Sequence, residues 1–410
     1  MLLELHILQN FAPANLNRDD TNAPKDCEFG GYRRARISSQ CLKRAIRGEF
    51  ATRELLPEDS LSKRTKTLVD RLVERLSQPG RDLELVRQVA ALAINAIGLE
   101  VKEGKTEYLL FISGQGIRQF ADLIESNWEV LSGRAAEEAA AAAAATKGSS
   151  PGGRRPRKAP KPKLAVDCLK SADTLLFDAR RAADIALFGR MIADRADKNV
   201  DAACQVAHAI STNRVEMEFD FYTAVDEFAP PDNAGAGMMG TVEFNSSCFY
   251  RYANLDFRQL CANLEGDSEL ALRAAEAFLR GSVTAIPTGK QNSMAAQNPP
   301  SFVLAVLRVG GHWSLANAFV SPVRAERDAS LVNKSIACLD DYWGKLVGTY
   351  GNQGIAHLAV VSVESHPLQH LQQALLVGDA TKPALERLVT GVRQALAEAS
   401  SSATASGVKA

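Results

Sequence analysis

The chain has 410 residues, and its 48 lysines and arginines are matched by 48 aspartates and glutamates. Apolar residues make up 46% and charged residues 23%, which excludes a wholly disordered chain and favours two or three folding units. A net charge of zero argues against nucleic-acid binding over the whole surface but allows local basic patches. No apolar run approaches the roughly 20 residues that span a bilayer, so we expect no membrane helix.

Residues 2–9 alternate apolar and polar side chains, which predicts a half-buried strand rather than a signal peptide. Residues 10–37 are polar and contain glycine, so we expect a loop there. A helix is then predicted to begin near Ser38 and Ser39, because serine is a favoured N-cap.

Residues 61–130 show helical periodicity, with breaks expected at the Pro79–Gly80 pair and at residues 114–116. The alanine-rich residues 135–145 extend the helical pattern. Residues 146–163 are rich in proline, glycine and positive charge and offer nothing to a core, which predicts a mobile loop or linker.

Helices are expected to resume at about 171–196 and 200–210. Two strands then follow, at 213–225 and 241–252, around a proline- and glycine-rich tip at 229–240. Long strands that flank a flexible tip predict a projecting hairpin.

The C-terminal part alternates helices with buried-type strands. The expected elements are helices at 256–264 and 268–281, a strand at 302–309, a helix at 330–347, a strand at 356–363, a helix at 382–398 and a frayed tail. This order predicts an α+β sheet domain that carries a helical insertion at about 55–165 and a hairpin insertion at about 211–245.

The segment from Gly30 to Arg47 carries the most chemical information, because residues 31–47 include six basic residues and no acidic one. Gln40, Lys43 and Arg47 share one face of the predicted helix, and Leu42, Ala45 and Ile46 face the core. Beside a serine-capped N-terminus, this cationic row predicts a phosphate-binding surface. A merely solvated basic helix face remains the alternative.

A second basic patch spans residues 147–163, with seven basic residues and no acidic one. A polycation of this kind gains affinity for DNA by releasing counterions. A solubilising linker explains the same composition.

The sequence gives little support for a disulfide, a metal site, a catalytic site or a cofactor site. The seven cysteines are scattered without metal-ligand spacing, which favours reduced thiols in a cytosolic protein. The acids of residues 17–20 lack a third ligand for a metal-dependent nuclease, and His366 and His370 do not form a zinc pair. His208 lies in an apolar stretch that we interpret as a core helix. No hydrolase, phosphate-loop or dinucleotide motif occurs, so we expect neither an enzyme nor a cofactor.

Seven blocks of sequence occur together in an order that resembles one known family, the Cascade backbone subunit (CasC) of type I-E CRISPR–Cas systems. The blocks are residues 15–20, 29–45, 184–191, 206–212, 221–227, 249–254 and 315–319. The helical block at 50–165 and the last 80 or so residues resemble the family only loosely.

The resemblance implies an RRM-like (ferredoxin-like) palm, a large helical fingers insertion and a β-hairpin thumb. The implied boundaries are palm at 1–54, fingers at 55–170 with the basic loop 146–163, palm helices at 171–210, thumb at 211–245, palm again at 246–398, and a flexible tail at 399–410.

The resemblance also implies a function. Copies of the chain polymerise head-to-tail along a CRISPR RNA in an antiviral surveillance complex with other Cascade subunits, and they present the guide for pairing with target DNA. A nuclease–helicase effector is recruited, and the chain itself is not an enzyme. Two alternatives stay open: a type III-like backbone that cleaves target RNA with Asp226 or Asp232, and a general RRM-like single-strand RNA-binding protein.

The resemblance also implies roles for individual residues of this chain. The implied guide-RNA contacts are Arg18, Lys25, Ser38, Gln40, Lys43, Arg47 and Met191. The implied base-kinking residues of the thumb are Phe221, Tyr222 and Thr223. The implied duplex-DNA contacts are Arg154, Arg155, Arg157, Lys158, Lys161 and Lys163.

Overall fold

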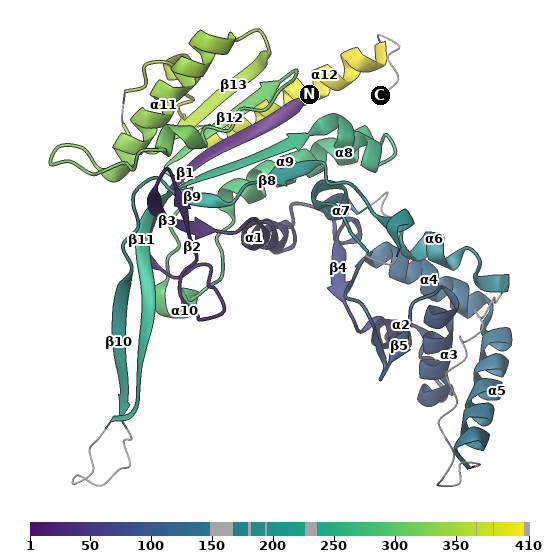
Figure 1. The fold of residues 1–410 in the computed structure, drawn as a ribbon. Helices are drawn as coiled ribbons and strands as arrows, with labels where there is room; N and C mark the ends of the chain where they lie inside the picture. The colour runs from purple at the N-terminus through teal and green to yellow at the C-terminus, as the bar shows by residue number, and fades with distance from the viewer. Residues whose placement is uncertain are drawn as a thin grey trace. The chain divides into compact units, whose positions relative to one another are not determined.

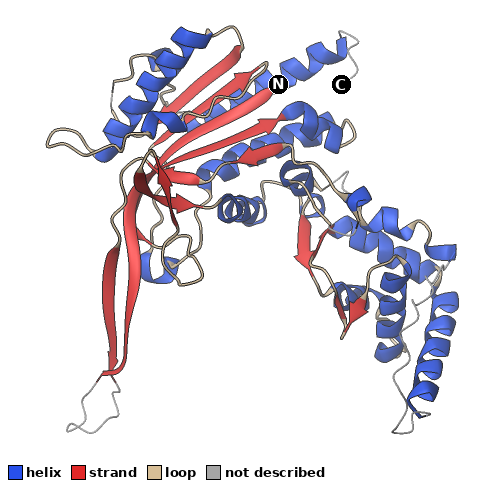
Figure 2. Cartoon of the chain, in the orientation of Figure 1, coloured by secondary structure: helices blue, strands red, loops and turns tan. Residues whose placement is uncertain are grey.

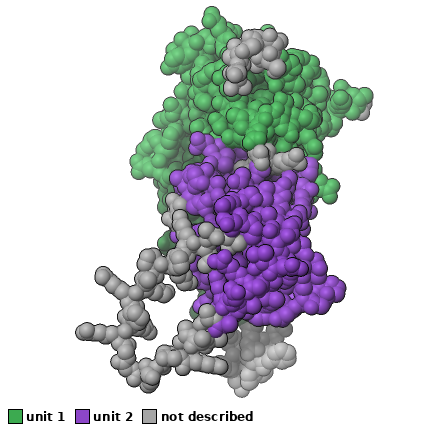
Figure 3. Space-filling model, turned by 90° about the vertical axis from the view of Figure 1, so that its right-hand side faces the viewer, with its two compact units in different colours: residues 1–56, 202–410 green, residues 57–201 purple. Residues whose placement is uncertain are grey.

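The computed structural model describes residues 1–147, 167–178, 182–192, 195–225, 236–365, 367–379 and 381–405. The chain divides into two compact units, one of residues 1–56 with 202–410 and one of residues 57–201 (Figure 3). Helices and a large antiparallel sheet are both present, which confirms the α+β class. Within the described residues, no helix is long and apolar enough to cross a membrane.

The first unit is built on one antiparallel sheet with the strand order β13–β12–β1–β11–β9–β3–β2, and β8 and β10 also pair with β11 (Figure 1). The strands are β1 (Leu2–Ala14), β2 (Asp26–Phe29), β3 (Tyr32–Ile37), β8 (Cys204–Val206), β9 (Ala209–Ser211), β10 (Glu218–Val225), β11 (Ala236–Asp256), β12 (Phe302–Arg308) and β13 (Ile355–Ser362). The helices are α1 (Ser39–Thr52), α8 (Phe257–Asn263), α9 (Ser268–Thr284), α10 (Gln291–Met294), α11 (Leu331–Tyr350) and α12 (Ala384–Ala405).

Strand β1 is buried on both faces, so the half-buried strand expected at its start is a wrong prediction. Helices α11 and α12 pack on the central strands, and Figure 2 shows helices on both sides of the sheet. Glu4 and His6, on the face beneath α11, are fully buried. Glu4 accepts hydrogen bonds from Tyr252 Oη (2.6 Å) and from the backbone N–H of Trp313 (2.7 Å), and burial raises its pKa. His6 Nδ1 lies 2.9 Å from Tyr250 Oη, so both buried polar side chains have a hydrogen-bonding partner within the sheet domain.

Residues 10–37 are not one loop. Strand β1 continues to Ala14, and β2 and β3 form a hairpin over 26–37. Its turn is Gly30–Gly31, where φ is +63° and +78°, the left-handed conformation that such two-residue turns require. A Cβ on Gly30 would lie 2.3 Å from the carbonyl oxygen of Val320, so glycine is needed there for packing as well.

The helix expected at 200–210 is also wrong. Residues 204–206 and 209–211 form β8 and β9, which pair with β11. The alanine-rich local sequence favours a helix, but pairing with a long buried strand overrides that preference. The C-terminal elements, by contrast, follow the predicted order closely.

The second unit packs helices around its own apolar core. Its helices are α2 (Leu68–Leu76), α3 (Leu83–Ala96), α4 (Gly114–Ser126), α5 (Trp128–Lys147), α6 (Ala172–Leu176) and α7 (Ala183–Phe188). Two short two-stranded sheets interrupt the helical pattern expected over 61–130: β4 (Ser62–Thr65) pairs with β7 (Leu110–Ser113), and β5 (Val101–Lys102) forms a hairpin with β6 (Lys105–Thr106).

Two expectations for this unit need correction. Gly114 opens helix α4 instead of breaking a helix, because Ser113 caps it through a hydrogen bond from Gly116 N (3.0 Å). The single helix expected over 171–196 is instead the two short helices α6 and α7, and both belong to the second unit rather than to the sheet domain.

Candidate nucleic-acid interface

Helix α1 presents the predicted cationic row. Ser38 is its N-cap, and the Ser38 hydroxyl accepts a hydrogen bond from Cys41 N (3.3 Å). Leu42 and Ile46 are buried, whereas Gln40 on the opposite side is exposed. Lys43 and Arg47 are half-buried on the same face as Gln40, and the first turn carries no acidic residue. The helix therefore combines an N-terminal positive dipole end with adjacent cationic side chains.

Ser38 serves this surface as a cap rather than as an exposed ligand. It is only 6% exposed, and its backbone N–H donates to Asn17 Oδ1 (2.7 Å). That bond ties the start of α1 to the segment 15–25, which holds Arg18 and Lys25. The sequence left the cap open between Ser38 and Ser39, and the structure selects Ser38. Asn17, which positions Ser38, was missed.

The segment 15–25 is a folded turn. Lys25 N donates to Asn17 O (2.9 Å), and Asp19 Oδ1 accepts from Thr21 N (2.9 Å) and Ala23 N (3.0 Å). The Thr21 hydroxyl also donates to Asp19, and this hydrogen bond is the main reason that the pKa of Asp19 is lowered. The Asp19 carboxylate thus holds the turn, while Arg18 is exposed beside it.

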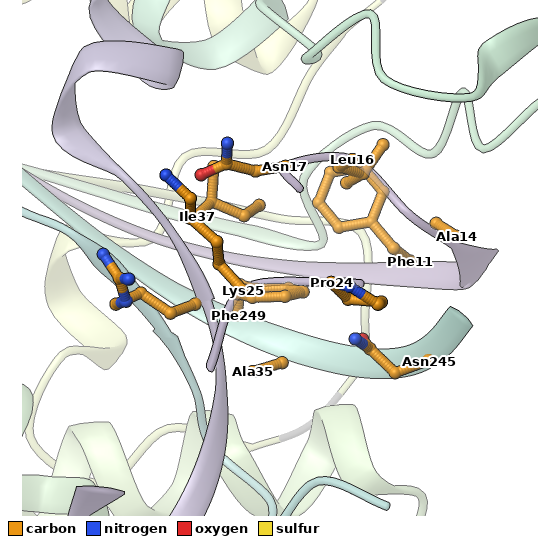
Figure 4. Close-up of a pocket in the computed structure, with 11 residues that line it drawn as sticks. Phe11, Ala14, Leu16, Asn17, Pro24, Lys25, Ala35, Ile37, Asn245 and Phe249 are labelled. Atoms are coloured by element: carbon orange, nitrogen blue, oxygen red, sulfur yellow. The ribbon is translucent and has the colours of Figure 1, made fainter. Parts of the chain in front are cut away.

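Lys25 and Asn17 also line a small hollow between β1, β3 and β11 (Figure 4). Its volume is about 10 Å³, which is room for about one water molecule. A small-molecule ligand does not fit there. The chemistry of this region is therefore that of an open cationic surface.

Arg36 and His208 add to this surface, and the sequence did not single out either as a binding residue. Arg36 Nε donates to Asp26 O (3.0 Å), and its Nη1 lies 3.0 Å from His208 Nδ1. His208 is exposed between β8 and β9, so the core helix predicted for it is wrong. Partial burial and the charges of Arg36 and Lys25 lower the pKa of His208.

One of the six basic residues in 31–47 is structural. Arg34 is fully buried and donates to the backbone carbonyls of Ser211 (3.0 Å), Thr212 (2.8 Å), Phe319 (2.7 Å) and Val320 (3.0 Å). Arg34 and Arg36 look alike in the sequence. The two residues share one face of β3, but residues 211–212 and 319–320 enclose Arg34, whereas Arg36 is half-buried beside the exposed His208.

The β10–β11 hairpin divides the predicted thumb residues between its two faces. Phe221 pairs with Thr241 and Thr223 with Met239 on one face. Tyr222 pairs with Gly240 on the other face, and a Cβ on Gly240 would lie 2.4 Å from Tyr222 Oη. Phe221 is 64% exposed, so its ring is available for stacking.

The remaining predicted residues lie elsewhere. Met191 belongs to the second unit and is 84% exposed. The six DNA-contact candidates of 154–163, together with Asp226, Asp232 and His366, lie outside the described residues. In the part of the chain that the structure describes, no group of three or more potential ligands could hold a metal ion.

Comparison with known proteins identifies the family of this chain. The sequence profile of the CT1975-like proteins matches residues 3–390. The chain belongs to the CT1975-like protein family.

Two solved structures resemble the CT1975-like chain over nearly all of its length. One is a chain of a CRISPR RNA-guided surveillance complex in a pre-nicking state, with 27% identity and a TM-score of 0.76. Another, from a CRISPR RNA-guided surveillance complex, shares 22% identity and the fold, with a TM-score of 0.68. Each match covers 95% of this chain and 100% of the other. No curated protein sequence matches significantly. The family and the structural matches confirm the resemblance to Cascade backbone proteins that the sequence predicted.

Proposed function

We propose that this chain is the guide-RNA-binding backbone subunit of a Cascade-type antiviral surveillance complex. The cationic face of α1 carries the proposal. The capped N-terminus of α1 is tied to the folded turn of residues 15–25. The helix contributes Lys43 and Arg47 to this surface, and the turn contributes Arg18 and Lys25. Such a surface binds phosphates without reading bases, as a protein that must accept any guide requires.

The rest of the chain fits the same role. We propose that the sheet unit is an RRM-like palm, that residues 57–201 form the fingers and that the β10–β11 hairpin is the thumb. Phe221, Tyr222 and Thr223 on the hairpin, and Met191 on the fingers, offer exposed side chains against displaced bases. Copies of the chain then follow one another head-to-tail along the guide and leave the intervening bases free to pair with target DNA.

We further propose that the subunit is not an enzyme and that any nuclease is recruited. We also propose that the chain assembles with the other Cascade subunits and that the complex is of type I-E. In the described residues all seven cysteines are free thiols, as expected of a cytoplasmic protein.

Co-purification tests the proposal. The full chain is expressed with its neighbouring subunits and a CRISPR array, and the bound RNA is sequenced. We expect RNA of uniform length that contains array sequence. RNA of random length and origin would instead support the general RNA-binding alternative.

A further inference from the structure

Asn15 is a fully buried polar residue at the point where the turn of residues 15–25 leaves the sheet. The pairing of β1 with β11 ends at Ala14 and Asn245, which Figure 4 shows on the two strands. Asn15 is the next residue of the chain, and the exposed Arg18 follows three positions later. A buried side chain cannot touch a guide RNA, so any part that Asn15 takes in binding is exerted through other residues.

The side-chain amide of Asn15 uses both of its N–H groups. Its Nδ2 donates to the backbone carbonyl of Asn22 (3.0 Å) and to the backbone carbonyl of Glu243 (2.9 Å). Because both partners are acceptors, the nitrogen of the amide and not its oxygen must face them. Asn22 lies in the turn, and Glu243 lies on β11 opposite Phe219 of β10. One side chain therefore ties the turn to the base of the β10–β11 hairpin.

Asn22 extends this link to a cation of the proposed guide-binding surface. Its side-chain Oδ1 accepts a hydrogen bond from Arg18 Nη1 (3.4 Å). A backbone bridge between Arg18 and Pro24 closes the same turn. The contacts therefore run from Asn15 to Asn22 and from Asn22 to Arg18, that is, from the buried end of the turn to its exposed cation.

The backbone at Asn15 is closely packed from a second direction. A Cβ on Gly289 would lie 2.4 Å from the carbonyl oxygen of Leu16 and 2.8 Å from that of Asn15. The segment between α9 and α10 therefore packs directly on these two residues. Close backbone packing and two buried hydrogen bonds together fix the start of the turn. A cation that is held in place before binding loses less conformational entropy when it meets a phosphate.

We propose that Asn15 is a positioning residue for guide-RNA binding, which holds Arg18 through Asn22 at a fixed place relative to the base of the β10–β11 hairpin. The inference rests on the proposed function, because it explains how one phosphate contact of that surface is prepared for the RNA. The turn and the hairpin then meet the RNA in a fixed relation, with Arg18 at a phosphate and Phe221 at a base.

A double-mutant cycle tests the proposal. Asn15→Leu keeps the approximate size of the side chain and removes both donors, and its effect is measured in the wild-type chain and in Arg18→Ala. Binding of the full chain to an RNA oligonucleotide is followed by fluorescence anisotropy. We expect Asn15→Leu to weaken binding about tenfold in the wild-type chain but only about twofold when Arg18 is already absent. The matched control is Asn127→Leu, which removes an amide that donates to Leu123 O (2.8 Å) in the second unit and should leave the affinity unchanged.

An unchanged affinity, or an equal loss in both backgrounds, would overturn the proposal, since a purely structural residue acts independently of Arg18. If Asn15→Leu does not fold, Asn22→Gly takes its place. Asn22 is exposed and has a φ of +70°, which glycine adopts without strain. We again expect a loss of affinity that is confined to chains that retain Arg18, and an unchanged affinity would contradict the proposal. Failure of the wild-type chain to bind the RNA would instead refute the proposed function, so the two failures are distinguishable.

Discussion

The guanidinium of Arg36 donates a hydrogen bond to Nδ1 of His208, with 3.0 Å between the two nitrogens. Because arginine has no acceptor, Nδ1 must be unprotonated and the neutral imidazole carries its proton on Nε2. Partial burial and the charges of Arg36 and Lys25 lower the pKa of His208 in the same direction. The histidine is therefore a reporter of the positive potential at the proposed guide-binding surface.

Replacement of Arg36 by glutamine should raise the pKa of His208 toward its ordinary value. The change removes a positive charge that opposes protonation of the ring. An NMR titration of the imidazole protons measures the shift, and Arg33→Gln on the same strand is the matched control. An unchanged His208 titration in the Arg36 variant would show that the two side chains do not interact in solution.

A lowered His208 pKa also has a consequence for stability. The unfolded chain takes up a proton at a higher pH than the folded chain, so stability falls as the pH drops through about 6.5, the unperturbed value. His208→Asn should reduce this loss between about pH 7 and pH 5. Urea unfolding at several pH values compares the two proteins, and parallel stability curves would contradict the assignment.

Loss of Lys43 and Arg47 should weaken guide binding without regard to RNA sequence. Each lost phosphate contact removes about one released counterion, so the slope of log affinity against log salt should fall by about 1–2 for Lys43→Ala with Arg47→Ala. Arg273→Ala with Lys345→Ala removes the same charge from exposed positions on α9 and α11 and serves as the control. An unchanged slope would support the solvated-face alternative.

Arg34, in contrast to Lys43 and Arg47, should contribute to folding stability and not to RNA binding. Arg34→Met leaves four backbone carbonyls without their donor, so unfolding should become easier by about 3 kcal/mol. The salt slope of RNA binding, measured on the folded fraction, should not change. A steep loss of that slope with normal stability would mean that Arg34 binds RNA.

The basic segment 149–163 should be dispensable for folding and for guide binding, since it carries no apolar residue for a core except alanine and proline. Its deletion should slow the engagement of duplex DNA by the assembled complex, as stopped-flow fluorescence with labelled DNA measures. A lower melting temperature of the complex would show that the segment packs on the fold.

Shortening the thumb by removal of residues 230–239, which include the start of β11, should leave a folded monomer that no longer forms an ordered array on RNA. An isolated two-stranded hairpin is only marginally stable in water, so β10 and β11 need a surface to pack on. Size-exclusion chromatography with light scattering, with and without guide RNA, compares the two lengths. Assembly of the shortened chain to the wild-type mass would exclude the tip as the contact between copies.

Local patterns predicted the features that depend on local sequence. Serine before an amphipathic run predicted a cap at Ser38 or Ser39, and the spacing of Gln40, Lys43 and Arg47 predicted their common face. Local patterns do not show which distant segments of the chain pair with one another. The run around His208 looks helical until β11 is placed beside it, and Arg34 is buried, unlike Arg36, because residues 211–212 and 319–320 enclose it.

The sequence pattern likewise did not predict which charged side chains are buried. Glu4 alternates with leucines as a surface residue would, yet inside the sheet domain its Oε1 accepts hydrogen bonds from Tyr252 and Trp313 and its Oε2 lies 3.6 Å from Arg308 Nε. Those partners lie some 250 and 300 positions away in the chain, so only the folded sheet brings them together.

The central claim is that copies of this chain assemble along a guide RNA. Light scattering of the full chain on guide RNAs of increasing length tests it most directly. The account predicts that the protein mass per RNA rises in steps of one protomer for each fixed increment of RNA length. A mass of one protomer per RNA at every length would contradict it.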